Sequence, residues 1–208
     1  MPPLTYKPTF DKKIIEGGVL SDVQLEAVSY AGQAHEQVLP DGSTRGFFLG
    51  DGTGIGKGRT ISGVILDNFN KGRKKAIWIS ENTKLAKDAE RDITALFGDK
   101  NVLHIFEGGK KTEKSLDFDE GILFTTYSAV SKGYDKEGSN LEKIVNWLGK
   151  DFDGVIAFDE AHNMKNTGLS QGRRGRVQAS GYSLAGLELQ KLLPKARVIY
   201  SSATGATE

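Results

Sequence analysis

The stretch "FFLGDGTGIGKGRTISGVI", residues 47–65, places a short apolar run, a glycine-rich loop and a periodic apolar pattern in direct succession. This order predicts a strand, a tight loop and a helix. Glycine occupies every even position from Gly50 to Gly58, so the backbone can adopt positive φ angles and turn its N–H groups onto an anion. The dipole at the start of the helix favours the same anion. A flexible glycine-rich turn is the alternative, but the order of strand, loop, lysine and periodic helix favours a phosphate-binding loop.

The loop departs twice from the pattern G-x-x-x-x-G-K-[ST]. Asp51 stands at the first glycine position, and Gly58 stands where serine or threonine normally ligates magnesium. Thr53 and Thr60 are nearby hydroxyls, but neither is in register, and water could take the vacant coordination place. Lys57 is expected to reach the outer phosphates as a mobile point charge. The residues assigned here to nucleotide binding are Gly52, Thr53, Gly54, Ile55, Gly56, Lys57, Gly58 and Arg59.

Apolar runs elsewhere in the chain predict further strands, which would form a sheet with the strand at residues 47–49. Four of them predict further buried strands, at residues 76–79, 121–124, 154–158 and 197–200. These runs are continuous rather than alternating, as expected of strands covered on both faces. Apolar residues at helical spacing lie between several of them, at residues 61–69, 85–96 and 141–148. Strands that alternate with helices predict an α/β fold, with a mainly parallel sheet and helices on both faces.

Composition narrows the class of protein. The 208 residues are 38% apolar and 26% charged, which fits one globular domain. With 28 basic and 27 acidic side chains, no overall field favours nucleic acid or a membrane. The absence of cysteine excludes disulfides, thiolate zinc sites and cysteine nucleophiles. No apolar run approaches the roughly 20 residues of a membrane span, and the first ten residues lack the basic and apolar regions expected of a signal peptide. We therefore expect a cytoplasmic protein, or a nuclear one in a eukaryote, that does not contact membranes.

The first residues are expected to form an arm. Pro2, Pro3 and Pro8 favour extended backbone, because proline fixes its own φ angle and disfavours helix in the residue before it. We divide the chain into an N-terminal arm at residues 1–17 and a nucleotide-binding domain at residues 18–208.

Two further polar motifs follow apolar runs. The stretch "GVIAFDEAHNMKN", residues 154–166, ends a buried strand with Asp159 and Glu160. In a nucleotide site one such carboxylate holds magnesium, commonly through water, and the next polarises the attacking water. A solvated strand end is the alternative. The stretch "SSATGATE", residues 201–208, follows the last run and offers Ser202 and Thr204 near the same edge of the sheet.

The loop lysine, Asp-Glu-Ala-His and Ser-Ala-Thr, in that order, resemble the first RecA-like domain of superfamily-two helicases. Residues 20–65, 79–93, 154–166 and 193–208 are similar to the helicase domain of the strawberry notch family, and the resemblance runs from about residue 18 to the end. That family shows the same Lys-Gly-Arg ending of the phosphate loop. By this resemblance, glycine at position 58 is a trait of the family. Where the family often has cysteine in the acidic motif, this chain has Ala161.

The resemblance implies a site for ATP with Mg²⁺. Lys57, Asp159 and Glu160 would be its catalytic residues: Asp159 would hold the magnesium, mainly through water, and Glu160 would orient the attacking water. Gln24 would contact adenine through its amide, which offers both a donor and an acceptor. The alternative for Gln24 is a capping box with Ser21, in which it reaches back to the start of its own helix.

The resemblance also implies contacts with nucleic acid, with DNA as the expected kind. Thr83, Lys84, Thr125 and Thr126 match positions where related motors touch the phosphate backbone, and hydroxyls and lysines make such contacts without reading bases. The alternative for Thr83 is that it caps a helix beginning at Lys84. Ser202 and Thr204 would couple nucleotide hydrolysis to movement.

These features predict the ATP-binding first lobe of a helicase or translocase that couples ATP hydrolysis to movement on nucleic acid. An arginine finger would come from a second RecA-like domain in a longer protein, so the domain alone is expected to be monomeric and to hydrolyse ATP weakly. The alternative is a nucleotide-dependent interaction module in a transcription or chromatin regulator, without motor activity. A small phosphotransferase fits less well, because such enzymes carry the loop nearer the amino terminus and lack the Ser-Ala-Thr motif.

Overall fold

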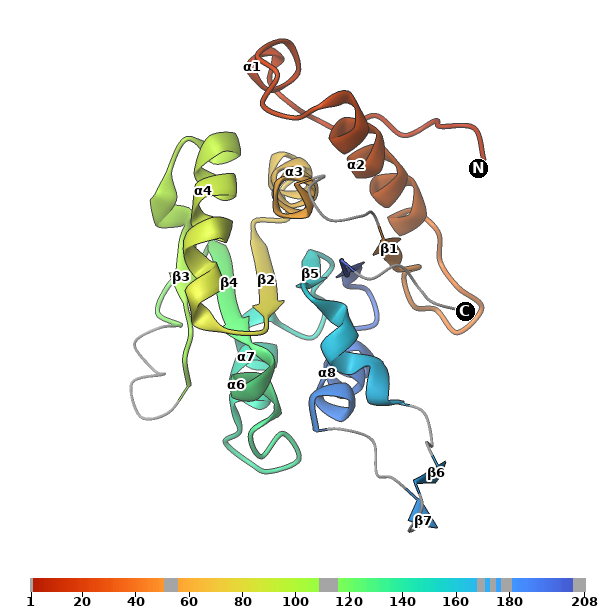
Figure 1. Ribbon diagram of the computed structural model, residues 1–208, viewed down its shortest axis with the longest axis vertical. Coiled ribbons are helices and arrows are strands. Elements are labelled where there is room, and N and C mark those ends of the chain that lie inside the picture. Colours follow the sequence, from red (N-terminus) through yellow and green to blue (C-terminus); the bar gives the residue numbers. More distant parts are fainter. Residues whose placement is uncertain are drawn as a thin grey trace.

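The computed structural model describes residues 2–50, 56–108, 116–167, 171–172, 175–176 and 181–203. The described chain is built on one six-stranded parallel sheet of order β1-β8-β5-β2-β4-β3 (Figure 1). Its strands are β1 (Phe47–Leu49), β2 (Lys75–Ser80), β3 (Leu103–Ile105), β4 (Gly121–Thr126), β5 (Val155–Phe158) and β8 (Arg197–Ser201). A separate antiparallel pair consists of β6 (Gln171–Gly172) and β7 (Gly175–Arg176).

Helices cover both faces of this sheet. Figure 1 shows α2, α3 and α4 on one side and α6, α7 and α8 on the other. The α-helices are α1 (Lys12–Glu16), α2 (Asp22–His35), α3 (Lys57–Asn70), α4 (Ala86–Phe97), α6 (Tyr127–Ser131), α7 (Asn140–Leu148) and α8 (Gly181–Leu192). Short 3₁₀ helices are η1 (Thr83–Leu85), η2 (Lys100–Val102) and η3 (Ala161–Thr167). The predicted α/β fold, a parallel sheet with helices on both faces, is confirmed. No helix in the described ranges has the length and apolar character needed to cross a membrane.

The central strand β2 explains why the apolar runs are continuous. Ala76 and Trp78 face the cluster that includes α3 and α4, whereas Ile77 and Ile79 face the cluster that includes α7 and α8. All four side chains are buried. Side chains of a strand point alternately to opposite faces, so a sheet covered on both sides needs apolar residues at every position.

All five predicted strands are present. The sequence analysis identified neither the short pair β6 and β7 nor the strand β3. This strand has only three residues, lies at the edge of the sheet and pairs with β4 alone. Its residues are half-buried or exposed, with His104 in the middle. A strand covered on fewer sides needs no continuous apolar run, so its sequence carries little signal.

The N-terminal arm lies against the domain. Its residues before α1 are not helical, as predicted, and the backbone N–H of Thr5 donates to the side-chain oxygen of Gln33 on α2 at 2.8 Å. Asp67 of α3 is 1% exposed and anchors the arm. It accepts hydrogen bonds from the Tyr6 hydroxyl at 2.5 Å and from the backbone N–H of Thr9 at 2.6 Å. Lys71, one turn later on α3, pairs with the same carboxylate at 3.1 Å.

A candidate nucleotide site at the carboxyl edge of the sheet

The phosphate loop connects β1 to α3. Residues 51–55 lie outside the described part of the chain, and they include the predicted contacts Gly52, Thr53, Gly54 and Ile55. The described ends agree with the prediction, because β1 ends at Leu49 and α3 begins at Lys57. Gly56 is the N-cap of α3 with φ 71° and ψ 51°, a left-handed conformation in which glycine is favoured. The strand-loop-helix order is therefore confirmed on both sides of the loop.

Gln24 lies beside this loop and also caps its own helix. The side chain of Ser21 accepts from the backbone N–H of Gln24 at 3.2 Å, and that of Gln24 accepts from the backbone N–H of Ser21 at 3.0 Å. The capping box is thus confirmed. Nε2 of Gln24 is also 3.4 Å from the carbonyl oxygen of Gly56. A contact with adenine stays a prediction, and the amide is in place at the end of the loop.

Two residues of the first turn of α3, Arg59 and Thr60, are held within the domain. Nε of Arg59 lies 3.2 Å from Oδ1 of Asp92 on α4, and its Nη1 donates to the carbonyl of Val19 at 2.9 Å. Thr60 is only 3% exposed. The guanidinium of Arg59 is therefore held between α4 and the segment before α2, and the Thr60 side chain lies in the packed interior.

Asp159 follows β5 at the carboxyl edge of the sheet. Its backbone N–H continues the ladder by donating to the carbonyl of Ile79 at 2.8 Å. Its Oδ2 accepts from Nε1 of Trp78 at 3.3 Å and from the hydroxyl of Ser80 at 3.5 Å. Burial raises the pKa of this carboxyl, with the charge of Glu160 acting in the same direction. Both hydrogen bonds are long, so the oxygen keeps capacity for a cation, and a hard carboxylate oxygen suits magnesium.

Trp78 connects the acidic motif to the phosphate loop, a role that the sequence analysis did not assign to it. Its Nε1 end reaches Asp159. Its Cη2 atom lies 3.8 Å from the position that a Cβ on Gly58 would have. One indole ring thus lies between the first turn of α3, which begins at Lys57, and the Asp159 carboxylate. A tryptophan inside a continuous apolar run has no sequence signal that separates this role from core packing.

Glu160 has an unusual backbone. Its φ of 49° makes it the one non-glycine residue with positive φ in the described ranges. Its N–H donates to Oδ1 of Asp159 at 3.0 Å, and its carbonyl accepts from the backbone N–H and Nδ2 of Asn163 at 3.0 and 2.9 Å. Such conformations cost on the order of 1 kcal/mol or more and persist where surrounding bonds hold them. The side chain is therefore set at the sheet edge by a strained turn.

His162 links the acidic motif to the Ser-Ala-Thr motif. Its Nδ1 lies 3.3 Å from Oε2 of Glu160 and 3.4 Å from Oγ of Ser202. The backbone N–H of Ser202 donates to the carbonyl of Leu49, the last residue of β1, at 3.2 Å. Ser202 therefore contacts both the acidic motif and the strand before the phosphate loop. Thr204, its predicted companion, lies outside the described residues.

The predicted nucleic-acid residues follow β2 and end β4, two adjacent strands. Thr83 and Lys84 lie in η1, where Lys84 is exposed. The side chain of Asn82 accepts from the backbone N–H of Lys84 at 3.0 Å. The alternative in which Thr83 caps this helix is therefore wrong, because Asn82 is the cap.

Thr125 and Thr126 both use their hydroxyls inside the protein. Thr125 is fully buried and donates to the carbonyl of Phe106 at 2.8 Å. Oγ1 of Thr126 accepts from the backbone N–H of Ala129 at 3.1 Å and caps α6. This geometry favours Thr83 and Lys84 over Thr125 as contacts for a polymer.

Comparison with known proteins agrees with this geometry. A family model described as "P-loop containing NTP hydrolase pore-1" matches residues 1–208. The chain is 44% identical over 211 residues to protein strawberry notch of Drosophila melanogaster, covering 98% of this chain and 12% of the relative. It is 44% identical over 215 residues to human protein strawberry notch homolog 1, covering 100% of this chain and 15% of that protein. The chain thus spans less than a fifth of the length of these relatives.

A solved structure shares the fold at low sequence identity. The crystal structure of the DUF1998 helicase MrfA bound to DNA and AMPPNP has a TM-score of 0.66 and 14% identity, covering 98% of this chain and 28% of that chain.

Proposed function

The chain belongs to the family described as P-loop containing NTP hydrolase pore-1 and is 44% identical to strawberry notch proteins over nearly its whole length. From these findings we propose that it is the ATP-binding first lobe of a superfamily-two helicase or translocase. In this proposal ATP binds with Mg²⁺ at the carboxyl edge of the sheet. Its hydrolysis is coupled to movement on nucleic acid, with DNA as the expected substrate.

The observation that supports the proposal best is the convergence of the first turn of α3 and the acidic motif on Trp78. The indole lies between the first turn of α3 and the Asp159 carboxylate. Lys57 would reach the outer phosphates, Asp159 would hold the magnesium through water, and Glu160 would orient the attacking water. When bound, magnesium neutralises charge that develops on the transferred phosphate.

Contact with nucleic acid is assigned to η1. Lys84 is exposed and Thr83 half-buried at the end of β2, and such side chains contact phosphates without reading sequence. The structural relative MrfA was solved with DNA and AMPPNP, which supports a site for both ligands on this fold. A second lobe of the longer protein would supply the arginine finger.

Substitution of the site residues in the full-length protein tests the proposal. Lys57→Ala is expected to weaken ATP binding measured by calorimetry. Glu160→Gln is expected to keep ATP binding and to slow hydrolysis by about 100-fold or more, as loss of a general base does. A Glu160→Gln protein that hydrolyses ATP at the unsubstituted rate would overturn the assignment. Two results together would favour the nucleotide-dependent interaction module instead. The unsubstituted protein would show no DNA-stimulated hydrolysis, and the Glu160→Gln protein would bind its partners as the unsubstituted protein does.

A further inference from the structure

Gly58 leaves room for a carboxylate from another helix. A Cβ built on Gly58 would lie 2.5 Å from Oδ2 of Asp92 on α4. Real Cβ atoms essentially never approach another heavy atom so closely. The place of a side chain at position 58 is therefore taken by the oxygen of an acid 34 residues later, so any residue larger than glycine requires the Asp92 carboxylate to shift.

The two oxygens of Asp92 have different surroundings. Oδ1 lies 3.2 Å from Nε of Arg59 and 3.7 Å from Nε of Arg91. Oδ2 faces Gly58 and accepts no hydrogen bond from the residues that the structure describes. Asp92 as a residue is 8% exposed, so it is removed from most water. Oδ2 nevertheless keeps contact with solvent, since the buried side-chain atoms without a partner among the described residues are Nδ1 of His35 and Oγ of Ser201. A carboxylate oxygen that water reaches beside the first turn of α3 can contact a cation or one of its waters.

We propose that Asp92 replaces the missing serine or threonine of the phosphate loop: Oδ1 holds Arg59, and Oδ2 supplies the oxygen that positions the magnesium of the bound nucleotide, directly or through one of its waters. This inference rests on the proposed nucleotide site. Its chemistry fits, because magnesium takes carboxylate oxygens and commonly keeps several waters.

Nucleotide binding with and without metal separates this role from a purely structural one. The measurement is the dissociation constant of a non-hydrolysable ATP analogue by calorimetry, in Mg²⁺ and in EDTA, together with the unfolding temperature. Asp92→Asn is expected to reduce the enhancement by Mg²⁺ by about 10-fold, the usual effect of losing an outer-shell partner of a metal. Asp88→Asn, one turn earlier on the exposed side of α4 and paired with Arg91, is the matched control and should leave the enhancement unchanged.

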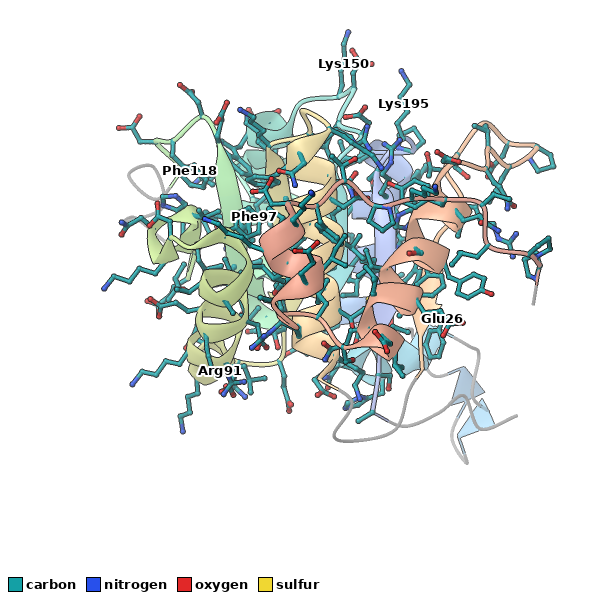
Figure 2. All side chains as sticks on the ribbon, turned by 90° about the horizontal axis from the view of Figure 1, so that it is seen from above. Glu26, Arg91, Phe97, Phe118, Lys150 and Lys195 are labelled. Carbon is teal, nitrogen blue, oxygen red and sulfur yellow. The ribbon has the colours of Figure 1, made fainter. Side chains whose placement is uncertain are left out.

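Arg91→Gln tests whether Asp92 acts only through its ion pairs. Arg91 lies on the outward side of α4 (Figure 2), and its Nε is 3.7 Å from Oδ1 of Asp92. This variant should leave the enhancement by Mg²⁺ within about twofold, since Oδ2 remains in place. The proposal is overturned if Asp92→Asn keeps the full enhancement, or if Arg91→Gln loses as much of it as Asp92→Asn does.

A paired substitution tests the exchange of positions directly. Gly58→Ser alone should lose Mg²⁺-dependent binding, because its Cβ meets Oδ2 of Asp92. Combining Gly58→Ser with Asp92→Ala should recover binding relative to Asp92→Ala, because the hydroxyl returns to its usual place. A double variant no better than Asp92→Ala contradicts the inference. If the unsubstituted protein binds no nucleotide in either buffer, the proposed function itself fails; if it binds and only the Asp92 results disagree, this inference alone fails.

Discussion

Nδ1 of His162 lies 3.3 Å from Oε2 of Glu160. The same ring nitrogen is 3.4 Å from the hydroxyl of Ser202. Glu160 is the residue assigned to orient water, and Ser202 follows a different strand, β8. His162 is therefore the side chain through which the acidic motif and the Ser-Ala-Thr motif contact each other.

Removing this contact should affect hydrolysis more than binding. His162→Ala leaves Lys57 and Asp159 in place, so the affinity for ATP should change little while the hydrolysis rate falls. Ser202→Ala should add less to the His162→Ala variant than to the unsubstituted protein, with a coupling energy of about 0.5 kcal/mol or more, because the two side chains act through one contact. A double-mutant cycle of hydrolysis rates in the full-length protein measures this. Strictly additive effects would show that the contact carries no coupling.

The ionised carboxylate of Asp159 should lower the stability of the nucleotide-free protein and support the binding of Mg²⁺. Burial raises the pKa of its carboxyl, so the folded state disfavours the ionised form and loses stability as the pH rises through that pKa. Asp159→Asn removes the buried charge and should raise the unfolding temperature of the nucleotide-free protein near neutral pH. It should also weaken the enhancement of nucleotide binding by Mg²⁺. Scanning calorimetry and binding measurements on one preparation check both changes, and a lower unfolding temperature would contradict the account.

The strained turn at Glu160 predicts a difference between two substitutions. Asparagine tolerates positive φ better than glutamine does, and the backbone of residue 160 has φ 49°. Glu160→Asn should therefore be more stable than Glu160→Gln, by about 1 kcal/mol, although both variants replace the carboxylate with a neutral amide. Urea unfolding of the two variants measures the difference. Equal stabilities would mean that the turn relaxes when its side chain is changed.

His35 predicts the acid sensitivity of the fold. It is 4% exposed, its Nε2 contacts the carbonyl of Val198 at 2.9 Å, and Nδ1 has no partner among the described residues. Burial lowers the pKa of His35 to about 4, below its usual 6.5. The unfolded chain therefore binds the proton first, and stability falls as the pH drops from 6.5 toward 4, by about 3 kcal/mol in all.

Urea unfolding between pH 7 and pH 4 measures this slope, with His35→Gln as the control. The variant keeps an N–H donor for the carbonyl of Val198 and has no titrating side chain at position 35. Its stability should therefore lack the fall that protonation of His35 causes between pH 6.5 and pH 4. Asp159 contributes with the opposite sign in both proteins, because its pKa is raised, and the comparison cancels it. A slope that survives in His35→Gln would assign the acid sensitivity to other groups.

The sequence predicted the sheet well because the physical signal is strong there. Strands such as β5 are covered on both faces, so they need apolar residues at every position, and this produces a continuous apolar run in the sequence. The glycines and lysine of the phosphate loop, and the acids that follow β5, indicate their function by residue type and order. The edge strand β3 lacks such a requirement and was missed.

Side-chain partnerships were much harder to predict. Nothing in the sequence places Asp92 against Gly58, since the two belong to different helices and the contact depends on how α3 packs against α4. Trp78 reads as a core residue and is one, but its nitrogen also reaches Asp159. The helix cap at Asn82 was assigned one residue too late, which is the usual scale of error at helix ends.

The strand before the phosphate loop lies at the border of the sheet, and β8 is its one neighbour in the described sheet. Leu49 is in register with Ser201, and its carbonyl receives the N–H of Ser202. A displacement of Ser202 would therefore act on Leu49, and so on the start of the phosphate loop, through the backbone contacts between β8 and β1. In the proposed function, a movement on the β8 side would then loosen the contacts of the loop with phosphate before any side chain of the nucleotide site moves.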